Sequence, residues 1–290
     1  MKNFVITSSS TCDMTLQFLI SRNIYYVSFY YYLDDIKFYD EFFKQHTVDE
    51  YYEKIKTCSV KTSQPDPEQY KDLWVKLIDQ GYDILHIELS SGISGAVNSA
   101  LIAKSMVEEV RKDAKVYVVD SLLASGGVGL LLDLAYKYKQ SCNDIDKVRD
   151  YVEGTKTNVN SLFFVENLDQ LIKGGRVSKV SGSIGKLLNI VPVLHVDSNG
   201  KLESIKKSRG LNNAIDEVIN LMKSNINDDS EIIISHSNCN DNAIKLSEKI
   251  KSTFPNCDLN NENITNIGTV IGGHTGKGCV AVFYLGKGRV

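Results

Sequence analysis

Three short apolar runs in the first half of the chain constrain its fold more than any other feature. They occupy 4–6, 84–89 and 116–119, and each ends in Ser, Thr, Asp or Gly before a helical pattern begins. Apolar runs of this length that alternate with helices are typical of βα units, whose strands form a parallel sheet. The hydroxyl-rich ends of these strands would then face a crevice, where parallel sheets usually bind their ligands.

The pattern changes after about residue 157. In the rest of the chain, apolar runs at 161–165, 190–196, 201–207, 231–235 and 279–285 alternate with helical segments. The length of 290 residues also exceeds that of most single domains. We therefore predict an α/β fold of two domains. The N-terminal domain at 1–157 has a parallel sheet, and the C-terminal α/β domain at 158–290 has a mixed or antiparallel sheet.

Two local elements are predicted between the first two runs. The aromatic, β-prone segment 24–39 predicts a hairpin, with its turn at Asp34 and Asp35. Asp66 can cap a helix in which Pro67 suits the first turn. The buried stripe expected for this helix consists of Leu73, Trp74, Leu77 and Ile78.

The composition excludes several classes of function. The 33 Lys and Arg residues nearly balance the 36 Asp and Glu residues, so no broad positive field attracts nucleic acid. The six cysteines form no CxxC pair, which argues against a zinc site and against a disulfide framework. No apolar run reaches about 18 residues, and the N-terminus lacks the apolar region of a signal peptide. We expect a cytoplasmic protein with no transmembrane segment and no metal.

Ser94 is the first candidate binding residue. It lies in a Ser- and Gly-rich turn that follows the buried run 84–89 and precedes a helix starting at Ala96. Free backbone N–H groups and the helix dipole make such a turn an anion site, although Ser94 could equally serve only to cap its helix. A nucleophilic serine is less favoured, because the nucleophile elbow needs G-x-S-x-G and Gly95 comes one residue too early.

Three further residues are candidates on weaker local patterns. Thr62 lies in a predicted loop just before the Asp66 cap, where it could present its hydroxyl or merely form a turn. Arg176 follows two glycines, which suits bidentate binding of phosphate or carboxylate, or a salt link between domains. His274 lies among glycines that allow a close approach to a ligand, or it is a structural histidine in a glycine turn.

Taken together, these motifs resemble those of one known family. They are Ile6-Thr7-Ser8-Ser9-Ser10-Thr11-Cys12-Asp13, Thr62-Ser63-Gln64-Pro65, Ser90-Ser91-Gly92-Ile93-Ser94-Gly95, Val119-Asp120-Ser121, Gly174-Gly175-Arg176 and Gly272-Gly273-His274-Thr275-Gly276. In this order and combination they resemble the DegV family of bacterial fatty-acid-binding proteins, which includes the FakB subunits of fatty acid kinase. Two positions depart from the family pattern, because Ser9 stands where Asp is common and Lys277 where Pro is usual.

The resemblance implies a lipid tunnel between the two domains. It implies that Thr62 and Ser94 hold the carboxylate of a long-chain fatty acid such as palmitate. Arg176 and His274 would serve the head group or the contact with a partner. That partner would be an ATP-dependent fatty acid kinase subunit, which phosphorylates the bound acid for lipid metabolism. No cofactor is implied, and transient contact with a membrane surface is compatible with this role.

We therefore predict a binding protein and not an enzyme. One alternative is an acyl hydrolase or transferase that uses Ser94 with His274 and Asp120. The other is a regulatory or scaffold protein in which a bound lipid is structural.

Overall fold

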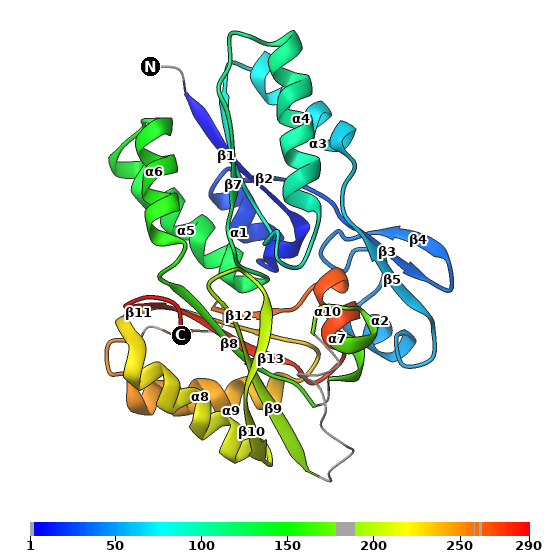
Figure 1. Cartoon of the computed structure of the whole chain (residues 1–290), viewed down its shortest axis with the longest axis vertical. Helices are drawn as coiled ribbons and strands as arrows, with labels where there is room; N and C mark the ends of the chain where they lie inside the picture. Colours follow the sequence, from blue (N-terminus) through cyan, green and yellow to red (C-terminus); the bar gives the residue numbers. More distant parts are fainter. Residues whose placement is uncertain (1–2, 167, 178–188, 258, 261–262) are drawn as a thin grey trace.

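The structure is a computed structural model that describes residues 3–166, 168–177, 189–257, 259–260 and 263–290. Its N-terminal part contains a four-stranded sheet in the order β2-β1-β6-β7, in which every pairing is parallel (Figure 1). The strands are β1 (Phe4–Ser9), β2 (Tyr25–Val27), β6 (Asp83–Glu88) and β7 (Val116–Asp120). The parallel sheet predicted from the three apolar runs is thus confirmed.

The C-terminal part contains a six-stranded sheet in the order β10-β9-β8-β13-β11-β12. Only the β11–β12 pairing is parallel, so the sheet is mixed, which is one of the two arrangements predicted. The strands are β8 (Val159–Phe164), β9 (Ile190–Val196), β10 (Leu202–Arg209), β11 (Ile226–His236), β12 (Ile264–Asn266) and β13 (Val280–Gly286).

A third sheet corrects two predictions. It has the order β4-β3-β5 and consists of β3 (Tyr30–Leu33), β4 (Ile36–Tyr39) and β5 (Val60–Ser63). The predicted hairpin exists only as β3 and β4, with Asp34 and Asp35 at positive φ in its turn, because β2 pairs with β1 instead. Thr62 lies in strand β5 and not in a loop, since residues 60–63 pair with β3. Strand propensity identified the aromatic segment but does not select the pairing partner.

The helices cover the faces of the two larger sheets. Helix α3 begins at Pro67, and the Asp66 amide donates to Gln69 Oε1 at 2.9 Å, as the capping pattern predicts. Its buried face is Tyr70, Trp74, Leu77 and Ile78, whereas Leu73 is only half-buried. The other helices are η1 (Ser10–Cys12), α1 (Leu16–Ser21), α2 (Val48–Lys54), α3 (Pro67–Asp79), α4 (Ala96–Val110), α5 (Gly126–Ser141), α6 (Ile145–Thr155), α7 (Asp169–Lys173), α8 (Leu211–Asn225), α9 (Asn240–Thr253) and α10 (Thr269–Thr275).

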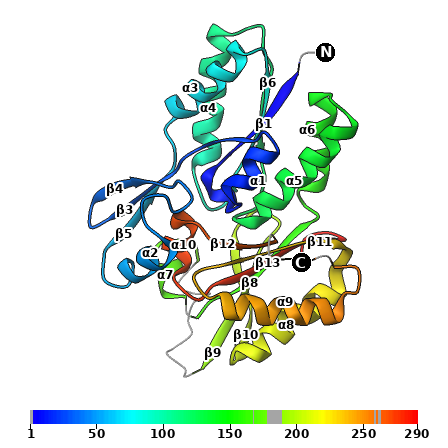
Figure 2. The same cartoon turned by 180° about the vertical axis from the view of Figure 1, so that it is seen from behind.

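The arrangement is layered. Helices α3 and α4 pack on one face of the parallel sheet, and α5 and α6 lie on the other (Figure 1). Helices α8 and α9 cover the outer face of the mixed sheet (Figure 2). In the part of the chain that the structure describes, none of these helices has the length and apolar character needed to cross a membrane.

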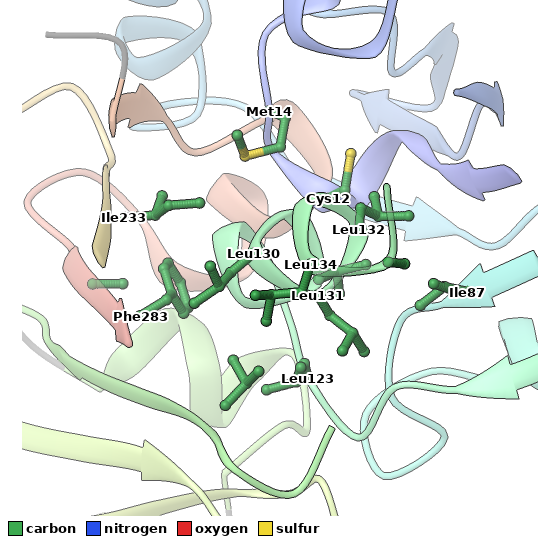
Figure 3. Packing of buried hydrophobic residues seen from close by; sticks show 14 of the residues in the cluster. Cys12, Met14, Ile87, Leu123, Leu130, Leu131, Leu132, Leu134, Ile233 and Phe283 are labelled. Atoms are coloured by element: carbon green, nitrogen blue, oxygen red, sulfur yellow. The ribbon is translucent and has the colours of Figure 1, made fainter. Parts of the chain in front are cut away.

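Helix α5 joins the two larger sheets into one core. Its leucines pack against Ile87 of β6 on one side and against Ile233 and Phe283 of the mixed sheet on the other (Figure 3). The helix approaches the mixed sheet closely because Gly126 and Gly127 start it, and a Cβ at Gly126 would lie 2.7 Å from the Phe283 ring. The two halves of the chain therefore share apolar packing.

Candidate functional site

A cavity of about 440 Å³ lies where the three sheets meet. Its lining includes Thr62, Ser94, Arg176 and His274, the four residues that were singled out in the sequence. Thr62 comes from β5 and Ser94 from the turn before α4, whereas Arg176 follows α7 and His274 belongs to α10. Both halves of the chain thus contribute two candidate residues each to one cavity.

Thr62 and His274 are in direct contact. Thr62 Oγ1 lies 2.7 Å from His274 Nε2, which joins β5 to the last turn of α10. Burial, and to a smaller extent the nearby charge of Arg176, together lower the pKa of His274 to about 4. The imidazole is therefore neutral near pH 7 and offers one N–H donor and one acceptor.

The position of His274 depends on two glycines. A Cβ at Gly174 would lie 2.4 Å from His274 Nδ1, and one at Gly273 would lie 2.9 Å from Val60 Cγ1. Any side chain at these positions would force α10 away from β5 or from the end of α7. The glycine-rich sequences around Arg176 and His274 thus permit close packing of three elements at the cavity.

Ser94 lies in the turn that leads into α4. Its Oγ accepts a hydrogen bond from the Ala96 amide at 3.2 Å, and its own amide donates to the Ser90 carbonyl at 3.1 Å. The N-cap residue of α4 is Gly95, so Ser94 is not the cap that the sequence left as an alternative, and its half-buried side chain lines the cavity one residue before the helix cap.

The turn carrying Ser94 is held by the hairpin between β9 and β10. Ser90 Oγ donates to the Gly200 carbonyl at 2.8 Å, and a Cβ at Gly92 would lie 2.6 Å from that carbonyl oxygen. Gly200 itself has φ +71°, a conformation that favours glycine. No local pattern had indicated that residue 200 supports the site, because the contact spans 110 residues of sequence.

Arg176 is a half-buried cation in the cavity wall. Its Nε donates to the Ile93 carbonyl at 3.2 Å and its Nη1 to the Gly174 carbonyl at 2.5 Å. Burial lowers the pKa of its guanidinium. Among the described residues no carboxylate forms an ion pair with it, so the salt link considered as an alternative is not observed there. The guanidinium retains donor capacity for an anion.

Gln64 was missed as a candidate. It lines the same cavity and its Nε2 donates to Ser99 Oγ on α4 at 2.8 Å. A Cβ at Gly95 would lie 2.5 Å from Gln64 Oε1, so the amide packs directly on the turn that carries Ser94. Its place in the Thr62-to-Pro65 motif was the only signal that could have indicated it.

The rest of the cavity is largely apolar. It continues towards an inner void of about 50 Å³ between α5 and the mixed sheet, and Ala124, Leu202, Ile271 and Thr275 line both spaces. The inner void is lined further by Phe163, Val196, Ile267, Cys279, Ala281 and Phe283. A cavity with polar groups and a smaller apolar void thus lie side by side and share part of their lining.

Ser9, which departs from the family pattern, belongs to a different region. Its Oγ donates to Glu88 Oε1 at 2.6 Å within a buried network that includes Tyr70 and His86. Glu88 therefore places a carboxylate beside Ser9 at the end of the parallel sheet. This network is separate from the lining of the cavity.

The observed contacts do not assemble a catalytic triad. His274 Nε2 is paired with Thr62, and Asp120 Oδ1 accepts from the backbone amides of Ser91 at 3.2 Å and Leu122 at 3.0 Å. A triad needs a base that contacts the serine and a carboxylate that contacts the base. Neither contact occurs among the described side chains of Ser94, His274 and Asp120.

Fold and site together define an α/β protein that carries a binding cavity where its three sheets meet. The chain belongs to the DegV family, because the family model, described as an uncharacterised protein of that family, matches residues 3–287. A DegV domain-containing protein of Clostridium perfringens is 33% identical over 99% of this chain and 98% of its own length. A protein of Thermotoga maritima named fatty acid-binding protein is 31% identical over 95% of each chain.

Solved structures share the whole fold. A DegV lipid-binding protein from Thermotoga maritima matches with a TM-score of 0.86 and 28% identity, over 99% of this chain and 100% of its own. The Fatty Acid Kinase (Fak) B3 protein of Streptococcus pneumoniae, loaded with linoleic acid, matches with a TM-score of 0.85 and 24% identity, over 98% and 99% of the two chains. At that identity the second likeness concerns the fold alone.

Proposed function

We propose that this protein binds one long-chain fatty acid and is not itself an enzyme. The observation that carries the proposal is the cavity lined by Thr62, Ser94, Arg176 and His274, which adjoins an apolar inner void. The carboxylate lies at Thr62 and Ser94, and the hydrocarbon chain extends past Ile271 and Leu202. The fatty-acid-binding relative from Thermotoga maritima supports this ligand class.

Burial of the hydrocarbon chain dominates the affinity. Each buried methylene contributes about 0.8 kcal/mol, before the cost of association is subtracted. The polar end of the cavity mainly prevents an unpaired buried carboxylate and fixes the orientation of the ligand. Arg176 suits this task because its guanidinium lacks a carboxylate partner within the described chain.

The kinase role is the second part of the proposal. The protein presents the bound carboxylate to an ATP-dependent fatty acid kinase subunit in the cytoplasm, where the acyl phosphate forms for lipid metabolism. Arg176 and His274 contact the head group or that partner. The shared fold of the Fak B3 protein supports this role.

The last part of the proposal is the division of the chain into two domains. We set it after residue 157, so that the first domain carries Thr62 and Ser94 and the second domain, at 158–290, closes the acyl tunnel. The contribution of two candidate residues from each half supports this division.

Two measurements test the proposal. Protein purified from a bacterial host and denatured for mass spectrometry should release one equivalent of a long-chain fatty acid. Incubation of the loaded protein with radiolabelled ATP and the kinase subunit of a bacterial fatty acid kinase should then yield labelled acyl phosphate. Absence of any lipid would refute the binding function. Bound lipid without phosphorylation would instead support a regulatory protein with a structural lipid.

A further inference from the structure

Arg289 lies in the segment that follows β13 and donates to the backbone of three other segments. Its Nη1 donates to the carbonyls of Leu122 at 2.8 Å and Asp197 at 3.3 Å, and its Nη2 donates to the Lys156 carbonyl at 2.7 Å. The three acceptors belong to the loop before α5, the hairpin between β9 and β10, and the end of α6. One side chain therefore joins backbone from both halves of the chain.

The backbone around Arg289 is held on both sides. The Gly288 carbonyl accepts from Asn160 Nδ2 at 2.8 Å and from Asn225 Nδ2 at 2.9 Å, and the Val290 amide donates to Asn160 Oδ1 at 2.8 Å. Burial lowers the pKa of Arg289 only to about 10, so the guanidinium is charged near pH 7. Arg289 is thus an anchored cation whose donors are directed at carbonyl oxygens.

Two of the segments that Arg289 contacts meet at one buried serine. The Ser90 amide donates to the Leu123 carbonyl at 2.9 Å, in the loop before α5, and Ser90 Oγ donates to the Gly200 carbonyl at 2.8 Å. The Gly200 amide donates at 3.0 Å to the same Asp197 carbonyl that Arg289 contacts. Arg289 therefore holds both of the segments to which Ser90 is bonded.

The loop before α5 needs such support. Leu122 has φ 54°, in the left-handed region that leucine rarely adopts, and its Cα lies 3.1 Å from the position of a Cβ at Gly200. A backbone conformation of this kind persists only where surrounding contacts hold it. The bond from Arg289 is one such contact, and it lies two residues from Ala124 in the cavity lining.

Ser90 in turn forms the base of the turn that carries Ser94. The Ser90 carbonyl accepts from the amides of Ile93 at 3.2 Å and Ser94 at 3.1 Å. Ile93 and Ser94 line the cavity, whereas the fully buried Ser90 is not part of the described lining. A shift of Ser90 would therefore displace the proposed carboxylate site without changing any side chain in it.

We propose that Arg289 is a positioning residue for fatty-acid binding, which fixes through Ser90 the turn that presents Ser94 to the carboxylate. This inference rests on the proposed function. Arginine suits the role because its planar guanidinium offers several donors in fixed directions, so that it can hold separate carbonyls at once. Loss of Arg289 should weaken recognition of the carboxylate more than burial of the hydrocarbon chain.

The preference for hexadecanoic acid over hexadecanol tests this expectation. The two ligands share their hydrocarbon chain, so changes in its burial cancel in the ratio of the two Kd values. Arg289→Met should lower the preference about three- to tenfold, as is usual for an indirect coupling. Competitive displacement of a fluorescent fatty acid from delipidated protein gives both affinities. Circular dichroism at the assay temperature confirms that each variant is folded, so a general loss of stability does not alter the ratio.

A double-mutant cycle with Ser90→Ala tests the route. Ser90→Ala removes the bond to the Gly200 carbonyl and should itself lower the preference. In that background Arg289→Met should cause little further loss, because both changes act on the same turn. Arg289→Lys keeps the charge on a single nitrogen and should lose less of the preference than Arg289→Met. It takes the place of Arg289→Met in the cycle if that variant does not fold.

Arg149→Met is the matched control. Arg149 is an arginine of α6 that pairs with Asp150 at 2.7 Å and does not belong to the described cavity lining. The control should keep the wild-type preference. An unchanged preference in Arg289→Met, or an equal loss in the control, would overturn the positioning role while fatty-acid binding stands. Full additivity of Ser90→Ala and Arg289→Met would overturn the route through Ser90. Failure of the wild type to bind either ligand would refute the proposed function itself.

Discussion

Thr62 Oγ1 and His274 Nε2 lie 2.7 Å apart although 212 residues separate them in the chain. The contact ties β5 to α10 at the polar end of the cavity. Because His274 is neutral near pH 7, its ring and the Thr62 hydroxyl can form one hydrogen bond and keep a further donor for a ligand.

The first prediction concerns Thr62. Thr62→Val keeps the shape of the side chain but removes the hydroxyl, so the carboxylate loses a donor and His274 loses its partner. A hydrogen bond to a charged group is worth about 1.5–3 kcal/mol, so the Kd for hexadecanoic acid should rise roughly 10- to 100-fold. Isothermal titration calorimetry on delipidated protein measures this change. Thr62→Ser should bind almost as the wild type does, and equal affinities of Thr62→Val and wild type would contradict the proposed carboxylate site.

The second prediction concerns Arg176. The wild type should prefer hexadecanoic acid to hexadecanol, because only the acid presents an anion to the guanidinium. Arg176→Met removes that cation and should reduce the preference about tenfold or more. Competitive displacement of a fluorescent fatty acid gives both affinities. Arg22→Met, which removes a cation paired with Asp133 away from the cavity lining, serves as the control. An undiminished preference in Arg176→Met would place the anion elsewhere.

The third prediction follows from the lowered pKa of His274, about 4 against an ordinary value of 6.5. As the pH falls from 6.5 towards 4, the unfolded chain binds a proton at His274 that the folded protein refuses. The folded state therefore loses stability in this window, by up to roughly 3 kcal/mol at about 1.4 kcal/mol per pKa unit. Above pH 6.5 His274 is neutral in both the folded and the unfolded state, so no stability is lost through its titration.

Urea unfolding of delipidated protein at several pH values between 7 and 4 tests this expectation. His274→Asn lacks the titrating group, so its free energy of unfolding should fall less steeply than that of the wild type below pH 6.5. The lowered pKa values of His46 and His236 contribute to both proteins and cancel in the difference. Parallel curves would show that His274 titrates normally.

The fourth prediction concerns Asp40, which follows β4 and contacts the first residue of α10. The carboxyl is fully buried, its Oδ1 accepts from Thr269 Oγ1 at 2.6 Å, and Oδ2 has no partner within the described chain. Burial raises the pKa of Asp40, and it raises the pKa of neighbouring Asp13 as well. Stability from these carboxyls is fully present below their ordinary pKa of 3.8 and is lost as the pH rises through the raised values.

Asp40→Asn keeps the acceptor for Thr269 but carries no charge. The variant should be more stable than the wild type at pH 7, by about 1 kcal/mol or more, because a buried ionised group is removed. The advantage should shrink as the pH falls, because burial raises the pKa of the wild-type carboxyl and makes it take up a proton more readily. Thermal unfolding at pH 7 and at pH 4 measures the difference. A variant that is less stable at pH 7 would mean that the charge of Asp40 is needed.

Local sequence patterns were sufficient for much of the architecture. The strands β1, β6 and β7, the start of α3 at Pro67 and the presence of a second α/β region all follow from periodicity and capping, which act between residues close in the chain. Thr62, Ser94, Arg176 and His274 were each recognisable as candidates from their neighbours in sequence, and their combined order indicated the family.

Tertiary structure alone decided how these pieces meet. The pairing of β2 with β1 and of β5 with β3, the contact of Thr62 with His274, and the support of Ser90 by Gly200 join segments distant in the sequence. Local propensity specifies which residues form a strand or helix. Which elements become neighbours depends on the burial of apolar surface and the pairing of polar groups over the whole chain.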